Sequence, residues 1–183
     1  VSSTGTDTYS AIAAAVGSLK GPKHGGANLK VMKQLDYILD TVKNPDDEDE
    51  VLALLEKILR KEAGDGSGLI YGIGHAVYTI SDPRAQLLKK HSKALAYEKG
   101  FAKEWNMLVM IEKLAPVAFR NVKGETKQVC ANFDLYSGLV YRMLGIAEEL
   151  FTPMFAIARC PGWCAHRIEE VTTGGRIIRP AYR

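Results

Sequence analysis

Apolar residues recur at three- and four-residue steps along most of the chain, which is the period of an amphipathic helix. The clearest such face consists of Leu29, Met32, Leu35, Ile38, Leu39 and Val42. Breaker pairs separate the periodic stretches, as at Gly21-Pro22 and Asn44-Pro45. Alternation of β-branched and polar residues, the signature of strands, is nearly absent. The pattern therefore predicts an all-α protein of about eight helices.

Capping residues refine this prediction. Asp82-Pro83 has the form of a helix start, with an aspartate as N-cap and a proline at the first helical position. The five consecutive acids 46–50 are interpreted as favourable charges at a helix start rather than as an ion site. Gly64 is expected to cap that helix, and 64–81 is the one long irregular stretch. Helices are predicted over residues 10–20, 29–42, 51–61, 83–100, 101–119, 129–145, 148–158 and 161–171.

Charge and composition narrow the function classes. Lys and Arg number 24 against 21 Asp and Glu, an excess too small and too dispersed to argue for a nucleic-acid partner. The longest uncharged stretch, 66–81, is shorter than the roughly 18 apolar residues of a spanning helix, so no membrane partner is expected. Three cysteines suit a reducing compartment and indicate a cytoplasmic location.

The cysteine spacing also argues against a metal site. Cys160-Pro-Gly-Trp-Cys164 has one residue too many for a redox C-x-x-C pair, and there is no second pair to complete a zinc site.

The start of the sequence suggests that the chain belongs to a longer polypeptide. Val1 stands where an initiator Met would be, and 6–19 already has a helical pattern, so we expect the chain to be a piece of a longer protein.

Two histidines lie in glycine-rich turns. His24 sits within 21–28, and His75 follows Gly72-Ile73-Gly74. Glycine allows a ligand to approach the backbone closely, and free N–H groups at a helix start attract anions. Each turn is therefore either a structural junction with a capping histidine or part of a binding site. His91 and His166 are interpreted as a surface residue and a core or interface residue.

Asp134 lies between aromatic residues at an otherwise apolar helix start. It either caps that helix or occupies an apolar pocket that raises its pKa, which is how enzymes make a carboxylate basic enough to accept a proton near neutral pH. Arg84, Arg159 and Arg179 each stand close to a proline or a helix end. Arginine binds carboxylates through two parallel hydrogen bonds, although an ordinary surface position is the alternative for each.

Four segments together resemble the citrate synthase family, in the family's order and at plausible spacing. They are His24-Gly25-Gly26-Ala27-Asn28, Gly74-His75-Ala76-Val77-Tyr78 with Asp82-Pro83-Arg84, Asn132-Phe133-Asp134-Leu135-Tyr136-Ser137-Gly138, and Phe155-Ala156-Ile157-Ala158-Arg159. Any one of them is a weak signal, whereas four in order are specific. The likeness extends over the chain, from Thr4 to Pro180.

This resemblance implies an all-helical homodimer in which each subunit has a large and a small domain. Residues 25–131 would form the small, CoA-binding domain, and 1–24 and 132–183 would belong to the large one. Family members are substantially longer. Their missing part precedes Val1 and includes a histidine, in a His-Glu motif, that helps to hold oxaloacetate.

The resemblance also implies the chemistry. Asp134 would take a proton from the methyl of acetyl-CoA while His24 hydrogen-bonds the thioester oxygen, and His75 would donate to the oxaloacetate ketone. Arg84 and Arg159 would bind the oxaloacetate carboxylates, with Arg179 reaching across from the second subunit.

The CoA adenine would meet the chain around Ile73, Gly74 and Ala76. Many family members carry a basic residue for CoA phosphate where this sequence has Thr79. Because acetyl-CoA is a substrate, no cofactor is expected.

Two alternatives stay open. A 2-methylcitrate synthase shares these motifs and uses propionyl-CoA, and the lining of its acyl pocket cannot be assigned from this sequence. A helical CoA-binding or dimerising module without turnover is the other. A His-Glu motif upstream of Val1 in the full reading frame would indicate an enzyme, and a true start at Val1 would indicate the module.

Overall fold

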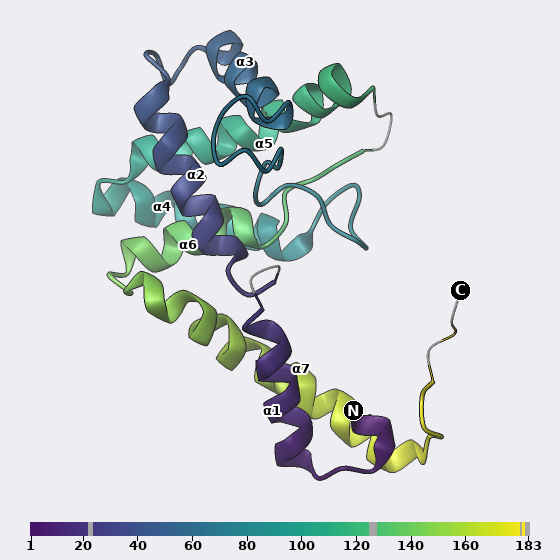
Figure 1. The fold of residues 1–183 in the computed structure, drawn as a ribbon. Coiled ribbons are helices and arrows are strands. Elements are labelled where there is room, and N and C mark those ends of the chain that lie inside the picture. The colour runs from purple at the N-terminus through teal and green to yellow at the C-terminus, as the bar shows by residue number, and fades with distance from the viewer. Residues whose placement is uncertain (22–23, 125–127, 180, 182–183) are drawn as a thin grey trace. The chain divides into compact units, whose positions relative to one another are not determined.

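The computed structural model describes residues 1–21, 24–124, 128–179 and 181, and within them every regular element is a helix (Figure 1). An isolated antiparallel bridge joins Ile73 to Ala131. The all-α prediction is therefore confirmed. The chain divides into two compact units, one made of 1–26 and 149–183 and the other of 27–148. The domain boundaries expected at 25 and 131 stay predictions. None of the helices in the described part is long and apolar enough to cross a membrane.

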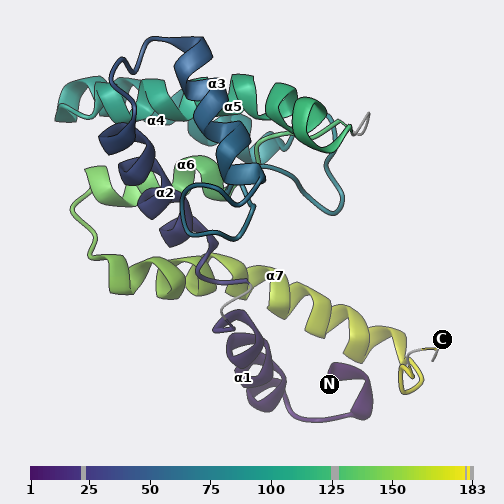
Figure 2. The same ribbon diagram turned by 45° about the horizontal axis from the view of Figure 1, so that its top comes forward.

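The unit 27–148 contains the larger core. Its helices are α2 (Ala27–Thr41), α3 (Glu48–Leu59), α4 (Pro83–Lys99), α5 (Ala102–Lys123) and α6 (Asp134–Met143). Helix α3 packs along α5, and α6 packs on both α2 and α4 (Figure 2). The largest fully buried side chains here are those of Met32, Leu35, Ile38, Val51, Leu55, Ile58, Met107, Leu108, Leu135, Tyr136 and Leu139.

Several helix boundaries follow the sequence signals. Asp82 caps α4, with Pro83 at its first position and Gly100 in the left-handed conformation at its end. Three acids of the predicted run lie in the first turn of α3. That helix ends earlier than predicted, because Lys61 at φ 67° turns the chain before Gly64 is reached.

Four predicted helices are wrong in extent. The helix expected from 129 begins only at Asp134, because the backbone of 130–132 pairs instead with 72–74: Gly74 N–H donates to Cys130 O at 2.7 Å and Asn132 N–H to Gly72 O at 2.8 Å. The helices expected over 148–158 and 161–171 are one helix, α7 (Phe151–Thr173), with Pro161 inside it. A proline removes one helical hydrogen bond, which a long helix can tolerate. Helix α5 likewise continues past Pro116 to Lys123, beyond its predicted end.

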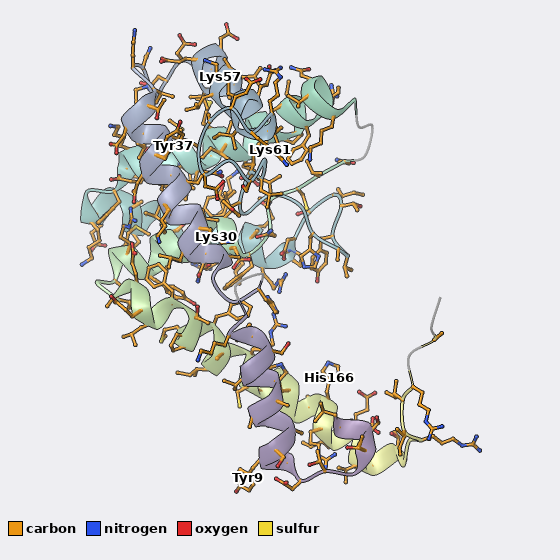
Figure 3. The ribbon with its side chains drawn as sticks, viewed as in Figure 1. Tyr9, Lys30, Tyr37, Lys57, Lys61 and His166 are labelled. Atoms are coloured by element: carbon orange, nitrogen blue, oxygen red, sulfur yellow. The ribbon has the colours of Figure 1, made fainter. Side chains whose placement is uncertain are left out.

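The other unit has a sparse core. Helix α1 (Thr8–Leu19) packs against α7, and the short 3₁₀ turn η1 (Ser2–Thr4) also contacts α7. Its buried apolar side chains in the described part are those of Leu19 and Phe151, whereas Tyr9 at the start of α1 points into solvent (Figure 3). A further group of large apolar side chains is exposed on the same two helices, namely Val16, Met154, Ile157, Ile168 and Val171.

Candidate active site

His75 is oriented by the backbone that follows it. Its Nδ1 accepts hydrogen bonds from the N–H groups of Val77 at 3.0 Å and Tyr78 at 3.1 Å, and its ring lies 4.9 Å from that of Tyr78. A ring nitrogen that accepts from two donors carries no proton, so the hydrogen of the neutral imidazole is placed on Nε2. His75 can therefore donate a hydrogen bond through Nε2 to a ligand.

Arg84 lies beside His75, with its Nη2 3.4 Å from His75 Nε2. Its guanidinium is held by Asp82 through Nε to Oδ1 at 3.0 Å and Nη2 to Oδ2 at 2.8 Å. Hydrogen bonds and charge from Asp82 raise the pKa of Arg84, with the charges of Tyr78 and Asp134 adding to the effect. The N–H groups of His75 Nε2 and Arg84 Nη2 lie close together and suit an acceptor oxygen of an anionic ligand.

Asp82 is fully buried and serves three partners at once. Besides the Arg84 side chain, its carboxylate accepts from Arg84 N–H at 3.0 Å, as the N-cap of α4, and from Phe133 N–H at 3.2 Å. Burial acts to raise the pKa of Asp82, but these hydrogen bonds and the Arg84 charge outweigh it and hold the pKa below the ordinary 3.8. The sequence predicts the cap. It does not reveal the bond to Phe133, which ties α4 to the start of α6.

Asp134 opens α6 and is half-buried. Asn132, two residues earlier, accepts from Asp134 N–H through Oδ1 at 2.9 Å and donates through Nδ2 to Gly74 O at 2.8 Å. One amide side chain therefore connects the helix start to the turn that carries His75. The structure thus brings together His75, Arg84 and Asp134. Asn132 was missed as a functional residue, and an Asn two positions before a helix-opening acid is the signal that could have indicated it.

His24 and Arg159 come together in the other unit. Both line a cavity of about 170 Å³ with Trp163, between the end of α1 and α7. The His24 ring meets Phe155 edge-on at 6.1 Å, and the Arg159 guanidinium lies 5.0 Å from the same ring. The backbone next to His24 requires glycine at position 25, because a Cβ there would stand 2.3 Å from Leu19 O.

The remaining predicted residues lie outside both groups. Arg179 is in the exposed tail that follows Gly174, next to Pro180, which is outside the described residues. Ile73 and Gly74 are half-buried and Ala76 is exposed.

For metal chemistry, no group of three or more His, Cys, Asp or Glu side chains in the described part of the chain is arranged to hold an ion. The thiols of Cys130, Cys160 and Cys164 are free.

Comparisons with known proteins show which family the chain resembles. The family model described as citrate synthase, C-terminal domain, matches residues 1–181. The chain is 43% identical to citrate synthase 2 of Bacillus subtilis over 96% of its length, and 36% identical to a 2-methylcitrate synthase of Shewanella oneidensis over 98%. These alignments cover 41% and 42% of the relatives, so the chain spans less than half of their length.

Solved structures of citrate synthases also share the fold of this chain. A citrate synthase of Thermoplasma acidophilum, described as a ternary complex with carboxymethyl coenzyme A and oxaloacetate, superposes with a TM-score of 0.73 at 33% identity. That match covers 98% of this chain and 44% of the other. A match over nearly the whole sequence, with the same helical fold, shows that the chain belongs to the citrate synthase family.

Proposed function

We propose that this chain is the C-terminal part of a citrate synthase, which condenses acetyl-CoA with oxaloacetate and water to give citrate and CoA. The observation that carries the proposal is the group formed by His75, Arg84 and Asp134, in a chain that belongs to this family. The two ligands in the Thermoplasma complex, carboxymethyl coenzyme A and oxaloacetate, support the choice of substrates.

The first step is removal of a methyl proton from acetyl-CoA. Asp134 is the base in this proposal, because it is a half-buried carboxylate in the family-like segment 132–138. His24 stabilises the charge that develops on the thioester oxygen by donating a hydrogen bond to it. A positioned general base contributes about 10²–10⁴ in rate, and this is the share of the acceleration that we assign to Asp134.

The second step is attack of the resulting enol or enolate on the oxaloacetate ketone. His75 donates from Nε2 to the ketone oxygen as the carbon–carbon bond forms, and its Nδ1 is already occupied by backbone donors. Arg84 and Arg159 bind the substrate carboxylates, and Arg179 does so from the second subunit. Water then hydrolyses the citryl thioester and releases CoA as the thiol.

The proposal includes the binding of CoA and the assembly of the protein. Ile73, Gly74 and Ala76 meet the adenine, and 25–131 is the small, CoA-binding domain of a cytoplasmic homodimer. Acetyl-CoA is consumed as a substrate, and no separate cofactor is required. Thr79 lacks the positive charge that many family members place against CoA phosphate, which should weaken CoA binding by this route.

A 2-methylcitrate synthase is the second candidate, because a relative of that name is 36% identical to this chain. The two differ in the acyl group, so the experiment is to follow CoA thiol release with oxaloacetate and either acetyl-CoA or propionyl-CoA. The polypeptide of the full reading frame should prefer acetyl-CoA in kcat/KM. Preference for propionyl-CoA would favour the second candidate.

The same assay tests the alternative that the chain is a CoA-binding module without turnover. The 183-residue chain alone should release CoA much more slowly than the polypeptide of the full reading frame, because the relatives are more than twice as long. Binding of CoA without thiol release by both polypeptides would contradict the enzyme and favour the module.

A further inference from the structure

A buried glutamine on α2 makes two hydrogen bonds to the segment that leads to His75. Gln34 Nε2 donates to Leu69 O at 2.9 Å, and Gln34 Oε1 accepts from Tyr71 N–H at 2.9 Å. The Gln34 side chain is therefore bonded at both ends of its amide, which fixes its orientation. It is only 8% exposed, so neither bond is readily replaced by water.

The end of the same segment is held by backbone. Asn132 N–H donates to Gly72 O, Gly74 N–H donates to Cys130 O, and Ile73 bridges Ala131. Residues 70–73 form a turn, in which Ile73 N–H donates to Ile70 O at 3.4 Å and Gly72 is at φ 80°, and the backbone of 130–132 holds the end of the segment at 72 and 74. Gln34 bonds the start of the segment, at 69 and 71, because its amide offers one donor and one acceptor like a peptide group.

The surroundings show why the glutamine is needed there. Gln34 borders a cavity of about 270 Å³, together with Lys30, Tyr37 and Tyr71. Lys30 and Tyr37 lie two turns apart on one face of α2 (Figure 3). The two bonds from Gln34 join this segment to α2, and Lys30 on the same helix places its Nζ 5.3 Å from the centroid of the Tyr71 ring.

We infer that Gln34 is a positioning residue that sets the CoA-binding segment around Ile73 and Gly74. The inference rests on the proposed function, since it assigns Gln34 to the binding of acetyl-CoA rather than to the chemistry. Gln34 touches no reacting group, so its removal leaves the machinery around Asp134 in place. It loosens the backbone around Ile73 and Gly74, and the loss falls on acetyl-CoA binding.

The test uses Gln34→Met and Gln34→Glu in the polypeptide of the full reading frame. Methionine keeps the length of the side chain but makes neither bond. Glutamate keeps the acceptor for Tyr71 N–H and faces Leu69 O with a second oxygen. A net hydrogen bond corresponds to about a fivefold change in an equilibrium constant, so Gln34→Met should raise KM for acetyl-CoA by about fivefold or more. KM for oxaloacetate and kcat should stay within about twofold.

Gln86→Met on α4 is the matched control. Gln86 is exposed and belongs to the same unit, but its side chain bonds Glu112 rather than residues 69–74. It should change none of the three kinetic parameters. Far-ultraviolet circular dichroism establishes that each variant is folded, and Gln34→Glu decides the question if Gln34→Met does not fold. The expected effect of Gln34→Glu on KM for acetyl-CoA lies between those of the wild type and Gln34→Met.

Amide hydrogen exchange at Tyr71 separates this inference from the proposed function. Its exchange should accelerate about fivefold or more in Gln34→Met and little in Gln34→Glu, whether or not the protein makes citrate. An active wild type in which Gln34→Met lowers kcat, or changes nothing, would overturn the positioning role. An inactive wild type with faster Tyr71 exchange would overturn the proposed function and retain the attachment of the segment by Gln34.

Discussion

Asp82→Ala is expected to destabilise the unit 27–148 far more than the loss of an ordinary helix cap. Alanine removes the N-cap of α4, which is worth about 1 kcal/mol. It also leaves the N–H of Phe133 without the carboxylate that accepts from it, at a cost of about 1–3 kcal/mol. The side chain of Arg84 is 41% exposed, so loss of the ion pair adds only about 0–1 kcal/mol after screening by water. The expected decrease in the free energy of unfolding is about 2–5 kcal/mol.

Asp47→Ala provides the matched control. Asp47 caps α3 in the same unit by accepting from Asp49 N–H at 3.0 Å and Glu50 N–H at 3.2 Å, but its side chain is exposed and makes no ion pair among the described residues. Asp47→Ala should lower the free energy of unfolding by only about 1 kcal/mol. Both changes share the loss of a cap, so the difference between them measures what Asp82 contributes beyond it.

Urea unfolding followed by tryptophan fluorescence measures this difference. The chain has two tryptophans, and a Trp163→Phe background leaves Trp105 as the reporter, which is buried between α4 and α5 in the unit under test. Equal losses for Asp82→Ala and Asp47→Ala would refute the reasoning. That result would mean that the bond from Phe133 N–H and the pairing with Arg84 contribute nothing measurable.

Three other predictions concern packing, pH and assembly. Gly138→Ala should destabilise the unit by about 1–3 kcal/mol in urea unfolding, because its Cβ would stand 2.9 Å from Asn28 O, whereas Gly17→Ala, with nothing within 4 Å, should stabilise α1 by about 0.5–1 kcal/mol. Because folding lowers the pKa of Asp82, its contribution to the free energy of unfolding should be complete above the ordinary pKa of 3.8 and disappear as the pH falls below that value. The wild type and Asp82→Ala should therefore converge in stability in acid. A stability difference that grows in acid would contradict this direction. Arg179→Ala and Asp134→Asn in the polypeptide of the full reading frame should each be nearly inactive but regain part of the CoA release when mixed, since a trans role for the arginine leaves one intact site in each heterodimer; no recovery with verified subunit exchange would exclude that role.

The sequence predicts the helices best where a local signal decides them. Asp82-Pro83 and Gly100 mark both ends of α4 because a cap acts within one turn. The start of α6 was missed for the opposite reason. Residues 129–131 are apolar enough to extend a helix, but 130–132 pair with 72–74, which lie far away in the chain. A pairing at such a separation has no local signature.

The site residues fall into the same two groups, those that a local motif predicts and those that it does not. His75, Arg84 and Asp134 were predicted because they stand in motifs, and the structure brings them together. The roles of Asn132 and Gln34, whose amide side chains bond the segment that precedes His75, were not predicted. Each bonds backbone that is distant in the sequence, and such a contact has no local signature.

The most direct test of the proposed chemistry is Asp134→Asn in the polypeptide of the full reading frame. The amide keeps the shape of the side chain but cannot accept the methyl proton of acetyl-CoA. Thiol release measures kcat, and titration calorimetry measures the Kd of oxaloacetate in parallel. The proposal predicts a loss of about 10²–10⁴ in kcat with an almost unchanged Kd. A loss in kcat smaller than about tenfold would contradict the role of Asp134 as the general base.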